Sequence, residues 1–368
     1  MNVEKGIITS MKFDQNDYLN WYIPRMRQAK AEDKINLSSS GVRPFRVDPA
    51  TLPDGPEFTM AQRFEEALAL WLGIGPDEVL FTPGGTGGTL LTLLCLADSD
   101  STIVMEQPMY EPMVRQAARL GRMVRLERRF EEGWRLPLER AWELMDDSTA
   151  VVSITEPTNP SGTYSHPDEV LELAKMAARR GAYLLVNEVY RGFSNRSSFH
   201  GMTDNLLVVN SLSKLLGGYQ FRLGWLSGNP ELIGRLRMGH VNMGIATAPG
   251  AAAGLVVLEK AEEIRQETMR VSQWGLPVVD AWVQATPGID WKKPEGPGFG
   301  AIALPEGVDD VAFGDHLYDQ RGVLSVPGTW FEAPGTLRLS WLQVGDRLEE
   351  GLAIIADALT SWKGEGGG

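Results

Sequence analysis

The stretch Ser211-Leu-Ser-Lys-Leu-Leu-Gly-Gly-Tyr-Gln-Phe-Arg-Leu-Gly-Trp225 places one lysine between two serines and a glycine pair, with an arginine eight residues after the lysine. A lysine that presents its amine to a phosphate-bearing aldehyde needs a permissive backbone, hydroxyl groups and a second cation nearby. These features predict that Lys214 is such an amine and that Arg222 is the second cation. The competing interpretation is a strand end and a glycine turn, with Lys214 in solvent and Arg222 in an ordinary ion pair.

The order Ser-x-Ser-Lys, Gly, Arg-x-Gly-Trp resembles the lysine segment of the class I/II aminotransferases, which are fold-type I enzymes that depend on pyridoxal 5'-phosphate (PLP). The resemblance implies that Lys214 forms a Schiff base with PLP and that Arg222, Ser211 and Ser213 bind its phosphate. One residue departs from the family pattern, because Gln220 stands where the family usually has glycine.

Upstream, a short strand at residues 79–81 leads into the glycine-rich run Thr82-Pro-Gly-Gly-Thr-Gly-Gly-Thr89 and then into an apolar helix. A glycine loop at the start of a helix exposes backbone N–H groups at the positive end of the helix dipole, where a phosphate binds well. The run is neither a Walker motif nor a dinucleotide fingerprint. A glycine turn without a ligand is the alternative. The resemblance assigns Gly84, Gly85 and Thr86 to the PLP phosphate.

Two further candidates follow predicted strands at residues 102–105 and 150–154. Tyr110 is suited to stack on a flat heteroaromatic ring, although an aromatic after Pro108 also fits a packed turn. Asn159, in Thr-Asn-Pro-Ser-Gly, can donate its amide to a ring hydroxyl, or belong to a plain Asn-Pro turn. The resemblance implies that Tyr110 covers the pyridine ring and that Asn159 contacts the 3'-oxygen of PLP and the substrate carboxylate.

The segment Asn187-Glu-Val-Tyr190 contains the main departure from the family, which has Asp-Glu-x-Tyr here. The family aspartate pairs with the protonated pyridine nitrogen and the tyrosine bonds to the ring oxygen, so the resemblance places Asn187 and Tyr190 there. An asparagine offers a dipole instead of a charge, and charge-assisted hydrogen bonds are the stronger kind. Glu188 cannot substitute, because adjacent strand residues point to opposite faces. We therefore expect a weaker electron sink.

Two predicted substrate contacts lie far from the lysine. The loop Leu-Ser-Ser-Ser-Gly41-Val suits tight turns, and it can also offer backbone N–H groups to a carboxylate. The resemblance to the family implies that this glycine loop, at Gly41, touches the substrate. Its Ser-Ser-Ser-Gly-Val sequence is most similar to capreomycidine-synthase-like members of the family. In the predicted strand Leu-Arg338-Leu-Ser-Trp, a solvated arginine is the ordinary interpretation, but a guanidinium is the natural partner of an amino acid carboxylate. The resemblance assigns Arg338 that role.

Strands and helices alternate from residue 79 to residue 227, which predicts an α/β fold with a mostly parallel central sheet covered by helices on both faces. In such a sheet the ligand binds at the carboxyl ends of the strands. The last ninety or so residues change character and predict a smaller α+β domain. The resemblance implies the PLP fold type I, with a large domain at residues 46–275 and a small domain formed by residues 1–45 and 276–368.

The composition of the chain limits the kinds of partner it can have. A net charge of −13 over 368 residues, with scattered basic residues, argues against nucleic acid. The only cysteine, Cys95, lies in an apolar run and is expected to be buried, and four histidines without ligand spacing give no metal site. No apolar run is long enough to cross a membrane and no leader is evident, so we expect a cytoplasmic protein. The tail at residues 364–368 is expected to fray.

These observations predict a PLP-dependent enzyme that acts at Cα of an amino acid through Lys214, with transamination slightly favoured. The alternative is a PLP enzyme of specialised biosynthesis that performs elimination, replacement or cyclisation, as Asn187 suggests. A non-enzymatic PLP sensor is disfavoured, because the sequence has no basic helix-turn-helix before the fold. A pseudoenzyme is disfavoured because the lysine and the arginines are intact. The family also implies a homodimer, although the tyrosine that usually reaches the partner's phosphate is missing from residues 52–58.

Overall fold

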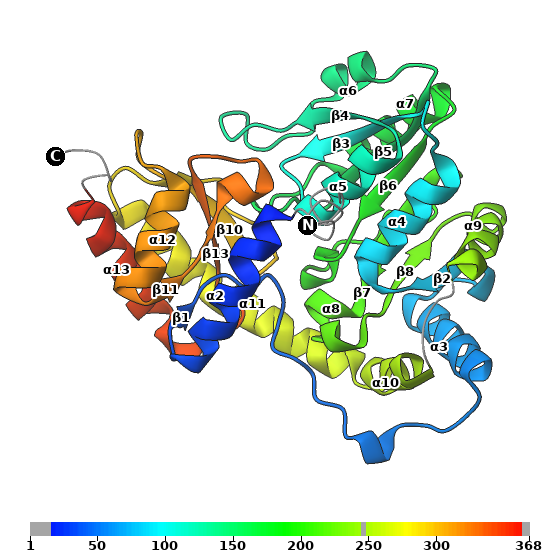
Figure 1. Cartoon of the computed structure of the whole chain (residues 1–368), viewed down its shortest axis with the longest axis horizontal. Coiled ribbons are helices and arrows are strands. Elements are labelled where there is room, and N and C mark those ends of the chain that lie inside the picture. Colours follow the sequence, from blue (N-terminus) through cyan, green and yellow to red (C-terminus); the bar gives the residue numbers. More distant parts are fainter. Residues whose placement is uncertain (1–15, 244–247, 363–368) are drawn as a thin grey trace, which may run out of the picture.

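A seven-stranded sheet forms the centre of the computed structural model, which describes residues 16–243 and 248–362 (Figure 1). The strand order is β2-β8-β7-β6-β5-β3-β4. Every neighbouring pair from β7 to β4 is parallel, and β8 runs antiparallel to both β7 and β2. The strands are β2 (Val79–Thr82), β3 (Thr102–Gln107), β4 (Arg122–Glu127), β5 (Thr149–Thr155), β6 (Tyr183–Asn187), β7 (Leu206–Ser211) and β8 (Gly224–Ser227). The predicted, mostly parallel sheet is confirmed.

Helices cover both faces of this sheet, as predicted. Two adjacent residues of β6 point to opposite faces of the sheet. Leu184 packs in the apolar cluster that includes residues of α6 and α7, whereas Leu185 packs in the cluster that includes residues of α4, α5 and α9. The helices around the sheet are α3 (Glu57–Leu72), α4 (Gly84–Leu96), α5 (Glu111–Leu120), α6 (Leu138–Leu144), α7 (Pro167–Arg179), α8 (Leu212–Leu215), α9 (Pro230–Asn242), α10 (Ala248–Glu259) and α11 (Ala261–Ala285). Burial on both faces explains the continuous apolar runs of the inner strands.

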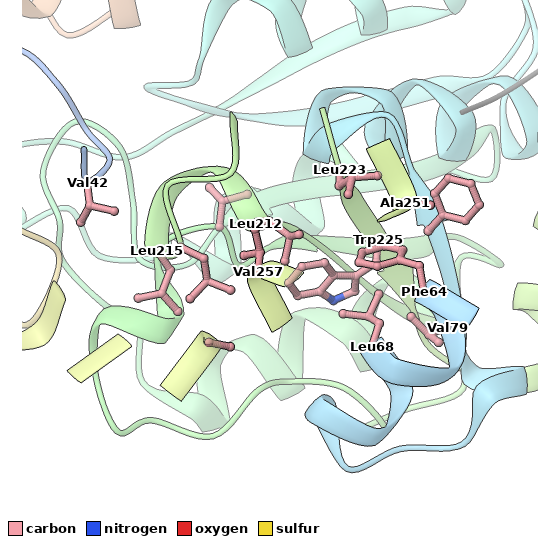
Figure 2. Packing of buried hydrophobic residues seen from close by; sticks show 14 of the residues in the cluster. Val42, Phe64, Leu68, Val79, Leu212, Leu215, Leu223, Trp225, Ala251 and Val257 are labelled. Carbon is pink, nitrogen blue, oxygen red and sulfur yellow. The ribbon is translucent and has the colours of Figure 1, made fainter. Parts of the chain in front are cut away.

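The short helix α8, which contains Lys214, rests on a large apolar cluster. Leu212 and Leu215 of α8 point into this cluster, together with Trp225 of β8, Phe64 of α3 and Val257 of α10 (Figure 2). Leu212, Phe64 and Val257 have no exposed surface. Full burial of one such side chain contributes about 1.5–3 kcal/mol, so the packing keeps α8 fixed at the end of β7.

A second body contains the antiparallel sheet β12-β13-β10-β9 (Figure 1). Its elements are β9 (Asp290–Trp291), β10 (Phe299–Ala303), α12 (Asp310–Arg321), β12 (Val326–Pro327), β13 (Thr336–Ser340) and α13 (Leu348–Ser361). Helix α2 (Asp17–Ala31) and strand β1 (Ile35–Asn36), which pairs with β11 (Val323–Leu324), join it from the other end of the chain. The domain limits at residues 45 and 275 stay a prediction.

Short 3-10 turns complete the connections. They are η1 (Pro49–Thr51), η2 (Pro76–Glu78), η3 (Arg191–Phe193), η4 (Tyr219–Phe221), η5 (Gly328–Phe331) and η6 (Gly345–Arg347). Within the described ranges, none of the helices combines the length and the apolar character that crossing a membrane requires. The tail predicted to fray, residues 364–368, lies outside the described residues.

Two details differ from the sequence analysis. The glycine-rich run is hardly a loop, because only Pro83 separates β2 from α4 and the residues from Gly84 onward are helical. The prediction that Cys95 is buried is wrong, since its side chain is exposed near the end of α4. Helix α9 approaches it from one side, where a Cβ on Gly239 would lie 2.3 Å from Sγ, and the side chain remains exposed among the described residues.

Glu188 is a buried carboxyl group beside the site. It accepts hydrogen bonds from the backbone N–H of Phe199 at 2.6 Å and from the hydroxyl of Ser198 at 2.7 Å. Burial nevertheless raises the pKa of Glu188 to about 7, because the low-dielectric interior disfavours its charged form. A raised pKa means that the folded protein binds this proton more tightly than the unfolded chain does, so ionisation of Glu188 costs stability.

We therefore expect Glu188→Gln to change the pH dependence of stability. The contribution of Glu188 is complete below the unfolded pKa, about 4.3, and is lost as the pH rises through its folded pKa of about 7. Relative to the variant, the wild type should lose up to about 3 kcal/mol between pH 4.5 and 8. Urea denaturation across this range measures the difference, and parallel curves for the two proteins would contradict the assignment.

Candidate active site

The strand β7 delivers the predicted lysine to the carboxyl edge of the sheet. Ser211 caps α8, because its hydroxyl accepts from the backbone N–H of Ser213 at 3.3 Å. Lys214 follows and is half-buried, and its Nζ donates to the hydroxyl of Ser40 at 3.0 Å. The amine of Lys214 thus points into the interior and is held there by Ser40, as a nucleophile or a base must be.

An anion site lies where α4 begins. A Cβ added to Gly224 would lie 2.5 Å from the carbonyl carbon of Gly84 and 2.7 Å from the nitrogen of Gly85, so the two backbones touch only because these residues are glycines. Gly84 has φ +74°, and a Cβ there would lie 2.9 Å from Nη2 of Arg222. The first N–H groups of the helix, including that of half-buried Thr86, have no partner within the helix. The free N–H groups at the start of α4 and the guanidinium of Arg222 therefore lie close together, as a site for an anion requires.

Arg338 is a further arginine of the site. It is not a solvated charge, because the residue is only 2% exposed. Its Nη1 donates to Oδ1 of Asn159 and its Nη2 donates to the carbonyl of Ser38, both at 2.8 Å. Its Nε is buried without a hydrogen-bond partner. Across the described residues no carboxylate pairs with this guanidinium, and such an arrangement suits an anionic ligand.

Asn187 is the last residue of β6 and is buried at 4% exposure. Its Oδ1 accepts from the backbone N–H of Val189 at 3.2 Å. The amide nitrogen therefore faces the other way, where it lies 3.6 Å from the sulfur of Met113. Glu188 points to the opposite face, as expected, so Asn187 is the polar group that this strand end offers to the site.

Two of the predicted residues are tyrosines that meet other aromatic rings. Tyr110 is half-buried before α5, with its ring 5.8 Å from that of Tyr18 in an edge-on arrangement, and burial raises the pKa of Tyr110 to about 12. Tyr190 packs edge-on against Phe299 at 4.8 Å, and its hydroxyl lies 3.1 Å from that of Ser40. The phenol of Tyr110 is therefore a neutral hydrogen-bond donor at ordinary pH.

The carbonyls of the serine loop face charged and polar side chains, because Ser38 accepts from Arg338 and Ser39 accepts from the hydroxyl of Ser340. That its backbone N–H groups bind a substrate carboxylate near Gly41 stays a prediction. Gly41 touches the lysine, since a Cβ there would lie 3.2 Å from Cα of Lys214. Ser40, which the sequence analysis missed, supplies the one hydroxyl of the loop that reaches Lys214. The sequence signal that could have indicated Ser40 is its position next to Gly41.

Gln220, the departure in the lysine segment, is exposed in η4. Its Nε2 donates to the carbonyl of Phe45 at 2.6 Å. The side chain therefore holds the segment after the serine loop and leaves the glycine contacts at Gly84 and Gly224 intact.

Comparison with known proteins agrees with this geometry. The family model described as "Aminotransferase class I and II" matches residues 8–349. The chain belongs to this family. It is 26% identical to the probable aspartate/prephenate aminotransferase of Aquifex aeolicus over 77% of this chain and 76% of that protein, and 26% identical to the histidinol-phosphate aminotransferase of Sulfurisphaera tokodaii over 56% and 59%.

Solved aminotransferases share the fold. A PLP-dependent aminotransferase from Streptococcus suis superposes with a TM-score of 0.85 at 24% identity, covering 96% of this chain and all (100%) of that chain. The aspartate aminotransferase of Thermus thermophilus with maleate gives a TM-score of 0.81 at 20% identity and covers 97% and 100%. This class I/II aminotransferase is thus a PLP-dependent enzyme with the PLP fold type I.

The groups present in the site fit PLP. The cofactor requires an amine for its aldehyde, an anion site for its phosphate and polar groups around its ring. Lys214 offers the amine, and the glycine contacts beside Arg222 leave space that any added Cβ would fill. Arg338 of β13 reaches the serine loop, where its Nη2 donates to Ser38, and its unpaired Nε suits a second anion, such as a carboxylate.

Gly224→Ala tests the packing of the anion site in this aminotransferase. The added Cβ would meet backbone atoms of Gly84, Gly85 and Asn210 within 2.7 Å, so the start of α4 must shift. We expect the free energy of unfolding to fall by about 1–3 kcal/mol and PLP to bind more weakly.

The matched control is Gly234→Ala in α9, where a Cβ meets nothing within 4 Å. Because alanine favours helix over glycine, this variant should gain up to about 1 kcal/mol. Urea denaturation and PLP titration of both variants make the comparison. Equal stability and affinity in the two would rule out a close contact at Gly224.

Proposed function

We propose that this enzyme transfers the amino group of an amino acid to a 2-oxo acid, with Lys214 as the residue bonded to PLP. The observation that carries the proposal is the buried guanidinium of Arg338, held by Asn159 and Ser38 and left with an unpaired Nε. A buried cation without a carboxylate partner is costly to the fold, and the cost is offset when an anionic ligand binds. The α-carboxylate of an amino acid supplies that anion.

The spacing along the serine loop supports a small substrate. Ser38 accepts from Arg338 and Ser40 accepts from Lys214. Two residues of extended chain span about 7 Å. An amino acid whose carboxylate bonds to Arg338 can therefore present its Cα to the amine of Lys214.

The remaining predicted residues have roles in this proposal that match their positions. Lys214 would bind the aldehyde of PLP. Its phosphate would be held by residues at the start of α4, at the start of α8 and before β8, namely Gly84, Gly85, Thr86, Ser211, Ser213 and Arg222. Tyr110 and Asn187 would hold its ring, and Asn159 and Tyr190 would bond to its hydroxyl. When bound, PLP supplies the electron-withdrawing group that lets the Cα–H bond ionise.

Once the amino group of the substrate has displaced it from the aldehyde, Lys214 would act as the general base. Its free amine would take the Cα proton and hold it beside Ser40. Arg338 keeps the carboxylate fixed, so the Cα–H bond stays directed at Nζ.

A second candidate function rests on Asn187. Because its Oδ1 accepts from Val189, the group left for the ring is the neutral amide NH₂. A neutral donor stabilises a protonated ring nitrogen less than a carboxylate does, which weakens the electron sink that transamination needs. Elimination, replacement or cyclisation in specialised biosynthesis is therefore the alternative.

Single-turnover reactions with a panel of amino acids and amines distinguish the two. The panel includes aspartate and histidinol phosphate, since similar proteins are named for them. Accumulation of pyridoxamine phosphate and a 2-oxo acid supports transamination. Release of an eliminated or cyclised product, with the cofactor still bound to Lys214, would replace that proposal with the second.

Arg338→Met should raise KM for the amino acid by about 30- to 1000-fold, because two charge-assisted hydrogen bonds to the carboxylate are lost. Arg338→Lys keeps the charge without the planar fork and should recover only part of this. Binding of PLP should change little in either variant. Unchanged KM values in steady-state assays would show that the carboxylate binds elsewhere.

We also propose that the enzyme is a homodimer. Leu94 on α4 and Met238 and Val241 on α9 are 47%, 69% and 68% exposed, and the contact between Gly239 and Cys95 brings the two helices together. Met238 and Val241, three residues apart on α9, form a small exposed apolar patch. A second copy of the chain is the occupant that the family membership favours.

Val241→Glu tests the dimer. A charge in the apolar patch should raise the dimer dissociation constant by about 10- to 100-fold, since an apolar side chain no longer becomes buried. Trp274→Glu, at an exposed aromatic on α11, is the control and should leave assembly unchanged. Light scattering during size-exclusion chromatography over a range of concentrations gives the result. A monomeric wild type, or equal effects of the two variants, would exclude this interface.

A further inference from the structure

The hydroxyl of Ser40 lies between two groups of the active site. Its Oγ is 3.0 Å from Nζ of Lys214 and 3.1 Å from the hydroxyl of Tyr190. Ser40 is 8% exposed and Tyr190 is 4% exposed, so bulk water scarcely competes for these bonds. The three groups form one short hydrogen-bonded chain.

The backbone around Ser40 is fixed on both sides. The N–H of Val42 donates to the carbonyl of Lys214 at 3.1 Å, and Nε2 of Gln343 donates to the carbonyls of Gly41 at 2.7 Å and Val42 at 3.1 Å. On the other side, the carbonyl of Ser39 accepts from Ser340. Because the backbone is held on both sides, the hydroxyl of Ser40 can take only the few directions that its staggered rotamers allow.

The other serines of the loop have different partners. The hydroxyl of Ser38 lies 2.6 Å from Oδ1 of Asn36, and the hydroxyl of Ser39 accepts from Nδ2 of Asn36 at 3.2 Å. Their side chains thus brace the loop itself, and Ser40 is the member of the triplet that meets the lysine.

A hydroxyl suits a lysine that changes its protonation state. It has one proton to donate and two lone pairs to accept with. When the amine of Lys214 carries its extra proton, Ser40 can accept from it. When the amine is neutral, Ser40 can rotate its O–H and donate, while Tyr190 stays bonded to the remaining lone pair.

We propose that Ser40 is a positioning residue for Lys214, whose hydroxyl holds the free amine in both protonation states and joins it to Tyr190. The proposal rests on the proposed function in one respect, namely that Lys214 is the residue bonded to PLP. Loss of the hydroxyl should leave the amine without a fixed direction, and its attack on the PLP aldehyde should become slower.

The test compares the isosteric variants Ser40→Val and Ser40→Thr, which differ in the hydroxyl but hardly in shape. Cofactor-free protein is mixed with PLP, samples are reduced with borohydride at timed intervals, and mass spectrometry measures the label on Lys214. We expect Ser40→Val to react about 10- to 100-fold more slowly than Ser40→Thr, because the neutral amine of Lys214 loses the contact that directs it. Ser39→Ala is the control and should react like the wild type.

Each outcome decides something. Equal rates for the valine and threonine variants would overturn the role of Ser40. If the larger side chains do not fit, Ser40→Ala against the wild type gives the same comparison, and equal rates there overturn the proposal too. A wild type that never acquires a label on Lys214 would instead overturn the proposed function, so the two failures are distinguishable.

Discussion

A guanidinium buried without a carboxylate is the constraint around which this site is built. The fold contains a contrasting case in Arg128, equally buried, whose side chain pairs with Glu106 and Glu156 at 3.0 Å each. Arg338 has only an amide oxygen and a carbonyl instead. Leaving a buried charge unpaired costs about 3–5 kcal/mol. The surrounding sheet and loop must supply that stability in the ligand-free protein, and they do so by packing Asn159, Ser38 and Arg338 into one rigid unit.

The sequence predicted the fold and the general location of the site because both depend on local patterns. Continuous apolar runs such as residues 150–154 mark strands buried on both faces. The polar residues that follow them, Asn159 and Asn187, then meet at one edge of the sheet. The roles of these residues came from the family resemblance, and their individual assignments stay predictions.

The remaining details depend on tertiary contacts that one sequence does not encode locally. Nothing in the order Ser38-Ser39-Ser40 says which hydroxyl faces the lysine, because that is decided by bonds from Ser340 and Gln343, some three hundred residues away. Cys95 lies in an apolar run typical of a core, yet its side chain stays exposed beside α9 in the described part of the chain. Glycines 84 and 85 suit a loop by propensity, but they open α4 and lie against Gly224, a contact between distant parts of the sequence.

The serine loop connects parts of the molecule that belong to different sheets. The segment at residues 36–43 receives hydrogen bonds from Arg338 and Ser340 of the antiparallel sheet, and it also bonds to Lys214 beside the parallel sheet. In the ligand-free protein a single short peptide thus carries contacts to both sheets, with the guanidinium of Arg338 bonded at Ser38 and the amine of Lys214 bonded at Ser40.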